Sequence, residues 1–200
     1  MEFNCDSIEV TRIKEDADYE GVRVQFHATL AKARIPMQLD IGFGDVITPG
    51  PTEVVYSTML DFPSPVLRAY PKETVIAEKL EAITVLGLLN SRMKDYYDLA
   101  LLSQMYPFDG ECLGRAILAT FRRRGTTIEA EPVGLTRAYW DDPARVLQWR
   151  AFVRRSRFGG TEGDLMRLVD EIRPFLLPVL SKIATEKSFN AQWEPSGPWE

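Results

Sequence analysis

A single lysine stands out in the segment PKETVIAEKLEAITVLGLL, residues 71–89. The segment has helical spacing, and at about 100° per residue its apolar side chains fill one continuous arc. Lys79 falls near the middle of that arc. Because an unpaired ammonium group is rarely buried, Lys79 must either reach solvent along its aliphatic stem or meet an anion. A lysine held on such a face is suited to binding phosphate groups.

The segment NSRMKDYYDL, residues 90–99, presents the opposite charge. Asp95 and Asp98 fall inside the apolar arc of a second helix, expected over residues 92–106, and Lys94 lies at the edge of that arc. Two carboxylates one turn apart on a buried face are costly unless a cation or hydrogen-bond donors meet them. We therefore predict that the two helices pack as neighbours, with the amine of Lys79 within ion-pair reach of at least one aspartate.

Two interpretations of this group of charges remain open. It could be a structural cluster, in which Lys79, Arg92 or Lys94 neutralises Asp95 and Asp98. It could also be a binding site, because a lysine already oriented by aspartates is ready to accept a phosphate group. The two interpretations are compatible with each other.

Two further candidates lie on expected strands. Asp40 shares the polar face of its strand with Gln38, opposite Leu39 and Ile41, and would face solvent or a cleft. His27 is the only histidine, and it also lies on a polar strand face. It is a candidate general base, although a surface or hairpin-pairing histidine is the more common case.

The spacing of apolar residues divides the chain into a β part and a helical part. Period-2 alternation predicts strands over 22–30 and 35–43, joined as a hairpin, and a third strand over 54–62. From Pro71 onward the spacing is helical, with helices expected over 71–89, 92–106, around 113–121, over 141–155 and over 163–180.

End signals refine this arrangement. Asp142 and Asp164 are the expected N-caps of the last two helices, and Pro174 and Pro178 should kink the final helix or end it early. The predicted fold class is α+β, with a small antiparallel or mixed β part over residues 1–70 and a helical lobe over 71–180. Residues 181–200 form a polar tail, expected to be loose apart from Trp193 and Trp199.

Composition narrows the class of protein. The 200 residues are 45% hydrophobic and carry a net charge of −5, which is typical of a globular protein and argues against a generally basic nucleic-acid coat protein. Cys5 and Cys112 form neither a metal-ligand spacing nor a disulfide framework. No stretch reaches the roughly 20 apolar residues of a membrane span, and we expect a cytoplasmic protein.

Four segments in this order resemble the AbiEii/AbiGii toxin family of nucleotidyltransferase-like proteins: YEGVRVQF, LDIGFGD, YPKETVIAEKLEAI and NSRMKDYYDL. The resemblance implies a nucleotidyltransferase fold with a helical C-terminal lobe, use of an NTP and Mg²⁺, and a role as a toxin that aborts phage infection or modifies tRNA. It implies an antitoxin and a tRNA acceptor as partners and no membrane, and it is compatible with a homo-oligomer.

The same resemblance gives roles to individual residues. Lys79, with Lys94 beside it, would steady the nucleotide phosphates. Asp95 and Asp98 match the acidic pair of the family's later motif and would orient Lys79 or the acceptor. Asp40 lies where a third carboxylate of the fold would bind metal.

The sequence departs from the family at its start. The family carries a glycine-rich turn followed by a Ser-x-Asp-x-Asp motif, which together hold phosphates and metal. Asp16 and Asp18 have the spacing but no preceding turn or serine, and GGTEGD, residues 159–164, lies between late helices. We therefore expect the C-terminal portion of a nucleotidyltransferase-like protein, inactive by itself. The alternative is a non-catalytic remnant or interaction module that keeps the charged cluster as scaffold.

Basic residues form two short runs, at 122–124 and 154–157, the second with Trp149 and Phe152 nearby. Arginines are favoured near helix C-termini, so solvated helix ends are the default interpretation. An RNA-facing patch is the alternative.

Overall fold

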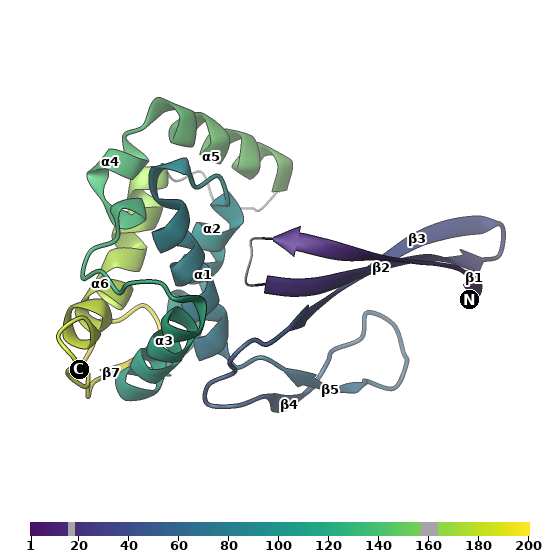
Figure 1. Ribbon diagram of the computed structural model, residues 1–200, viewed down its shortest axis with the longest axis horizontal. Coiled ribbons are helices and arrows are strands. Elements are labelled where there is room, and N and C mark those ends of the chain that lie inside the picture. Colours follow the sequence, from purple (N-terminus) through teal and green to yellow (C-terminus); the bar gives the residue numbers. More distant parts are fainter. Residues whose placement is uncertain (16–18, 157–163) are drawn as a thin grey trace. The chain divides into compact units, whose positions relative to one another are not determined.

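The computed structural model describes residues 1–15, 19–156 and 164–200 (Figure 1). The chain divides into two compact units, Met1–Asp45 and Val46–Glu200, and each is described by itself. Asp16, Asp18 and most of the GGTEGD segment lie outside the described residues. Strands and helices follow each other as the sequence predicted, and the α+β fold class is confirmed.

The first unit is an antiparallel sheet in the order β1-β2-β3, made by Glu2–Glu15, Tyr19–Leu30 and Ala33–Phe43. The expected hairpin is confirmed, with β2 and β3 paired along their whole length. Val24 lies opposite Leu39 on the apolar face, and Arg23 lies opposite Asp40 on the polar face. The strand β1 was not predicted. Its pairing with β2 shifts between Asn4 and Glu9, and this irregularity interrupts the alternation that marks a strand.

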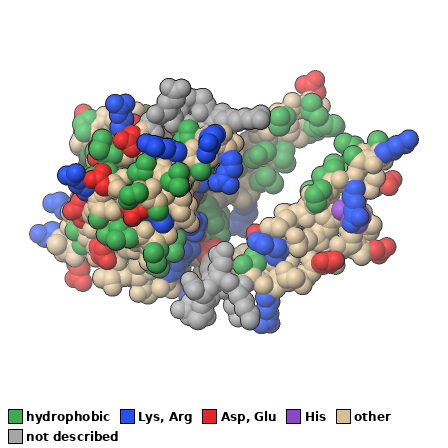
Figure 2. All heavy atoms as spheres, turned by 90° about the horizontal axis from the view of Figure 1, so that it is seen from above, with side chains coloured by type: hydrophobic (Ala, Val, Ile, Leu, Met, Phe, Trp, Pro, Cys, Tyr) green, Lys and Arg blue, Asp and Glu red, His purple; other side chains and the backbone are tan. Residues whose placement is uncertain are grey.

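The predicted strand over 54–62 is wrong in its extent. The strand β4 covers only Thr52–Val55 and pairs with β5, Val66–Ala69. Between them the chain turns, because the hydroxyl of Thr58 donates to the carbonyl oxygens of Leu60 and Phe62. Such local bonds compete with a strand ladder. Hydrophobic side chains of this region reach the surface, as others do elsewhere in the molecule (Figure 2).

The expected helices are present in the second unit. Their bounds are Lys72–Leu86 for α1, Met93–Met105 for α2, Gly110–Arg124 for α3, Arg137–Trp140 for the short α4, Pro143–Ser156 for α5 and Leu165–Ile183 for α6. Both N-cap predictions are confirmed. Asp142 accepts hydrogen bonds from the amides of Ala144 and Arg145, and Asp164 accepts one from Met166.

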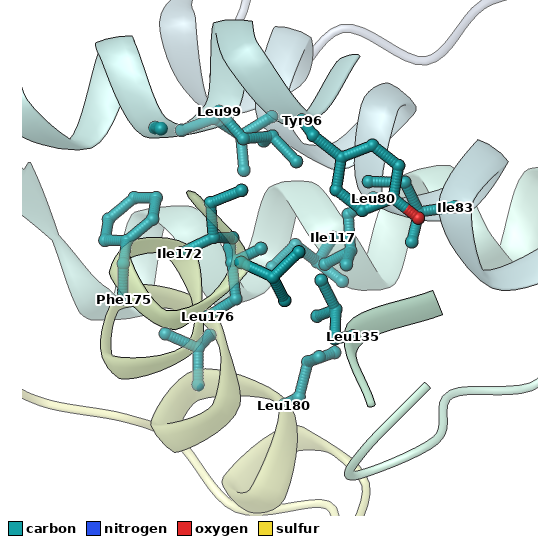
Figure 3. Close-up of a cluster of buried hydrophobic side chains, with 14 of the residues drawn as sticks. Leu80, Ile83, Tyr96, Leu99, Ile117, Leu135, Ile172, Phe175, Leu176 and Leu180 are labelled. Atoms are coloured by element: carbon teal, nitrogen blue, oxygen red, sulfur yellow. The ribbon is translucent and has the colours of Figure 1, made fainter. Parts of the chain in front are cut away.

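The hydrophobic core lies among α1, α2, α3 and α6. Side chains from all four helices meet there (Figure 3), and α6 contacts α2, α3 and α4. The expectation that Pro174 or Pro178 ends the last helix early is wrong, because α6 runs through both to Ile183. Burial of Ile172, Phe175 and Leu176, each fully enclosed, offsets the hydrogen bonds that the prolines remove.

The last residues pack back onto this core. The strand β6, Phe108–Asp109, pairs with β7, Gln192–Trp193. The indole of Trp193 is buried and donates to the carbonyl oxygen of Ser103, and the indole of Trp199 stacks on Phe175 and donates to its carbonyl oxygen. Among the described residues, no helix combines the length and apolarity needed to cross a membrane.

Candidate functional site

The helices α1 and α2 bring the charged residues together. A 3₁₀ turn over Gly87–Leu89 ends α1, and Asn90 then reverses the chain. Asn90 is fully buried; its side-chain oxygen accepts from the amide of Arg92 at 2.8 Å, and its carbonyl oxygen accepts from Tyr139 and Arg145 at 2.9 Å each. These bonds fix the start of α2, so Asp95 and Asp98 face α1 one helical turn apart.

Lys79 lies between the two aspartates. Its Nζ is 2.8 Å from Oδ1 of Asp95 and 2.7 Å from Oδ2 of Asp98. The predicted contact between the lysine and at least one aspartate is therefore confirmed, and it is made with both. The Nζ of Lys94 reaches the same oxygen of Asp98 at 2.6 Å.

Arg92 completes the group, which we call the Lys79 cluster: Lys79, Arg92, Lys94, Asp95 and Asp98. The Nε of Arg92 lies 2.6 Å from Oδ2 of Asp95. Its N–H bond does not point at that oxygen, which is buried and accepts no hydrogen bond from the described residues. The cluster thus holds three cations and two anions.

Burial grades the cluster from inside to outside. The side chains of Asp95, Lys79 and Asp98 are 5%, 17% and 18% exposed, whereas those of Arg92 and Lys94 are 57% and 67% exposed. Burial lowers the pKa of Lys79, but hydrogen bonds and charges from Asp95 and Asp98 more than offset it, and the pKa lies above its ordinary value. Lys79 therefore stays charged at neutral pH, with two exposed cations beside it.

Two buried tyrosines support the cluster and were missed by sequence reasoning. Tyr96 stacks on Tyr139 with ring centroids 4.9 Å apart, and its hydroxyl donates to the carbonyl oxygen of Gly134. Burial raises the pKa of both phenols, which keeps them neutral donors. Tyr96 could have been noticed in the sequence, because it is an amphipathic side chain next to Asp95. Its partners lie in a segment more than thirty residues away.

Asp40 and His27 belong to the first unit, whereas Lys79, Lys94, Asp95 and Asp98 belong to the second. It forms a bidentate ion pair with Arg23, at 2.8 and 2.9 Å, and also accepts from Gln38, as expected for a shared face. The hydrogen bond from Arg23 holds the pKa of Asp40 below its usual range. The single histidine, His27, bonds Asn4 and Arg34 across the sheet, which is the hairpin-pairing role considered for it.

Comparison with known families decides the relationship suggested by the sequence. The family model for the nucleotidyl transferase AbiEii toxin of type IV toxin–antitoxin systems matches residues 2–174. The chain belongs to the AbiEii family. No curated protein and no solved structure matches it. The matched segment contains the whole Lys79 cluster and also Asp40.

Nucleotidyl transfer generally uses a divalent metal that is held by converging carboxylates. Among the described residues, no three His, Cys, Asp or Glu side chains converge where they could hold a metal ion. Asp40 is engaged with Arg23, and Asp95 and Asp98 are engaged with Lys79. These residues do not fit a resident magnesium site. A metal role for Asp40 stays a prediction, since Mg²⁺ there would have to displace Arg23.

Proposed function

We propose that this AbiEii-family chain binds a nucleoside triphosphate through the Lys79 cluster, as part of nucleotidyl transfer to an RNA acceptor such as tRNA. The observation that supports the proposal most directly is the position of Lys79. It is a charged lysine held by two aspartates, beside two cations whose side chains are more than half exposed. Three positive groups, one from α1 and two from the start of α2, surround the two aspartates and complement the charge of a triphosphate.

Four residues of the cluster have a role in this proposal. Lys79 and Lys94 bind phosphate oxygens of the NTP, which arrives as its Mg²⁺ complex. Asp95 and Asp98 orient Lys79 and restrict its rotamers, so that less side-chain entropy is lost when a phosphate binds. Because Lys94 is exposed and its bond with Asp98 is an i,i+4 surface pair, it can turn to the ligand at little cost.

We propose further that the chain by itself binds nucleotide without completing the transfer. In-line displacement needs carboxylates that converge on metal ions at the attacking and leaving oxygens. In the described part of the chain, the carboxylates of the candidate site are already paired with cations. Family membership supports an antitoxin as the regulatory partner.

Titration calorimetry with Mg²⁺-NTP tests the binding proposal. We expect weak binding by the wild type and a loss of about tenfold in Lys94→Met, in line with one charge-assisted phosphate contact. Lys79→Met should lose more. Lys182→Met, which removes an exposed lysine at the end of α6, is the matched control and should bind as the wild type does.

The alternative function, a non-catalytic scaffold or interaction module, gives a different result. In that case Lys94→Met leaves NTP affinity unchanged, while Lys79→Met lowers stability as it does under either function. A separate assay addresses transfer: labelled NTPs, Mg²⁺ and total tRNA are incubated with the purified chain. We expect no label on the RNA. Transfer that disappears in Asp40→Ala would show that a complete site exists and that the proposed inactivity is wrong.

A further inference from the structure

The helix α5 concentrates positive charge. It has no acidic residue between Pro143 and Ser156, and it carries four arginines, Arg145, Arg150, Arg154 and Arg155. The whole chain, in contrast, has a net charge of −5. A region of one charge sign on a protein of the opposite sign attracts ligands that the rest of the surface repels. The charge of α5 therefore calls for an explanation, residue by residue.

Arg145 has a structural role. Its side chain is 13% exposed, and its guanidinium donates to the carbonyl oxygens of Leu89 and Asn90 at 3.0 and 2.9 Å. These hydrogen bonds hold α5 against the turn that precedes α2. The fold thus accounts for Arg145 without any ligand.

The other three arginines of α5 have no such role. Arg150, Arg154 and Arg155 are exposed, and their side chains form no hydrogen bond or ion pair with the described residues. The helix dipole favours cations in a last turn, but this effect does not extend to Arg150, which lies more than a turn before the end of α5. Arg150 and Arg154 are also four positions apart, and like charges at this spacing repel each other. An anionic ligand would relieve that repulsion.

A pocket of about 510 Å³ connects these arginines with the start of α2. Gln148 and Arg155 line it from α5, and Arg92 and Lys94 line it from the α2 side. Among the described residues that line the pocket, the only acidic one is Asp95, which is already ion-paired within the Lys79 cluster. The pocket thus has cations on two facing walls, and one wall belongs to the proposed phosphate site.

The arrangement of these charges favours a nucleic-acid strand over an acidic protein surface. Protein interfaces have an apolar centre, and Leu147 is the only large exposed hydrophobic side chain of α5. The cations instead follow one another along the helix. Arg150 and Arg154 lie about 6 Å apart along its axis, and Arg155 comes next, at the pocket. Guanidinium groups in such a row can each donate two parallel N–H bonds to successive phosphates of one strand.

We infer that α5 is the surface on which the acceptor RNA lies, with Arg150, Arg154 and Arg155 bound to successive phosphates of its backbone. The inference rests on the proposed function, which includes an RNA acceptor, and adds the surface that holds this acceptor. The strand reaches the pocket at Arg155, opposite Arg92 and Lys94, so RNA and NTP phosphates occupy facing walls. Because phosphate contacts do not distinguish bases, α5 binds RNA of any sequence.

Fluorescence anisotropy of a short labelled single-stranded RNA measures this binding on the full chain. The α5 variant, Arg150→Gln/Arg154→Gln/Arg155→Gln, should bind the RNA at least about tenfold more weakly than the wild type. The logarithm of the affinity falls linearly with the logarithm of the salt concentration, and each lost phosphate contact should make this slope shallower by about 0.7. RNAs of different sequence should give the same result.

A matched control removes the same charge elsewhere. Arg122→Gln/Lys182→Gln/Lys187→Gln changes three exposed cations that lie outside α5, and it should keep the RNA affinity and the salt slope of the wild type. Thermal unfolding shows whether the variants are folded. The α5 variant should melt no lower than the wild type, because its arginines have no partners and two of them repel each other. Arg145→Met should melt lower, since it removes two hydrogen bonds.

Calorimetry with Mg²⁺-NTP separates this inference from the proposed function. The α5 variant should bind NTP as the wild type does, whereas Lys94→Met should bind it more weakly. If the wild type binds NTP but the α5 variant and the matched control bind RNA equally well, only the inference about α5 is wrong. If the α5 variant alone loses RNA affinity while the wild type binds no NTP, the RNA surface stands and the proposed NTP site is wrong.

Two further results would overturn the inference. A loss of NTP affinity in the α5 variant as large as that in Lys94→Met would assign the arginines to the triphosphate instead of to RNA. Competition with poly-glutamate tests the alternative ligand, an acidic protein segment. If poly-glutamate displaces the labelled RNA as effectively as unlabelled RNA does, α5 does not select a phosphate backbone, and the assignment to RNA is wrong.

Discussion

The ammonium group of Lys79 on α1 lies 2.8 Å from Oδ1 of Asp95 on α2, sixteen positions along the chain. This bond is the only hydrogen bond that the carboxylate of Asp95 accepts from side chains of the described residues, since its Oδ2 accepts none. The lysine therefore satisfies a side chain that is almost completely buried.

Replacement of Lys79 by methionine should be strongly destabilising. Asp95 would be left buried without a hydrogen bond, and we expect the free energy of unfolding to fall by about 3 kcal/mol. Lys94→Met, which removes an exposed partner of Asp98, should cost less than about 1 kcal/mol. Urea denaturation midpoints measure both values. Equal losses in the two variants would contradict the described difference in burial between Lys79 and Lys94.

The cluster should also make stability depend on alkaline pH. The pKa of Lys79 is raised in the folded state above its unfolded value of about 10.4. Its contribution is therefore complete below about pH 10.4 and is lost as the pH rises through the higher folded value. The difference in unfolding free energy between the wild type and Lys79→Met should be constant from pH 7 to 9 and shrink above that window. If this difference in unfolding free energy instead grows above pH 9, the pKa of Lys79 is lowered rather than raised in the folded state.

Glu81 provides a test on the other side of α1. Its side chain is buried, and its two oxygens accept from Arg124 at 2.7 Å and from Thr126 at 2.6 Å. Arg124→Met leaves this carboxylate with one neutral donor, and we expect a loss of about 2 kcal/mol. Arg122→Met, an exposed position on the same turn, is the control. Thermal unfolding of both variants should show a clear shift only for Arg124→Met.

Two glycines with the same backbone angle allow a matched comparison. Gly125 and Gly197 both have φ +66°, but a Cβ at Gly125 meets nothing, whereas one at Gly197 would lie 2.3 Å from the indole of Trp193. Gly125→Ala should cost about 1 kcal/mol for the left-handed backbone alone. Gly197→Ala should cost at least about 2 kcal/mol more, because the buried indole must move. Similar melting temperatures would indicate that the last residues do not pack as described.

Helical spacing correctly brought Lys79, Asp95 and Asp98 together, because a charge on a buried face needs a partner whatever its exact degree of burial. A helical projection of residues 71–89 puts Glu81 opposite the apolar arc and Leu89 within it, but in the structure Glu81 is buried and Leu89, in the 3₁₀ turn after α1, is 82% exposed. The helix packs against α3 as well as α2, so its buried surface is wider than one apolar arc and includes the partner of Arg124.

Other parts of the fold depended on contacts that no local pattern contains. The hairpin of β2 and β3 was predictable because its alternation is unbroken, while the irregular pairing of β1 concealed a strand of 14 residues. Gln148 attracted no attention in the sequence, since a glutamine on a helix usually faces solvent. Its buried oxygen is apparent only once α5 has been placed against the start of α2.

The bonds at the far end of α2 have a consequence for the timing of folding. The carbonyl oxygen of Ser103 accepts from the indole of Trp193, 90 positions later, and from the amide of Ser196. During synthesis, at roughly 5–20 residues per second, these donors leave the ribosome several seconds after Ser103 does. The nascent chain can form α2 early but cannot complete its C-terminal contacts. Translation order therefore delays the final packing of the helix that carries Asp95 and Asp98 until Trp193 and Ser196 have been made.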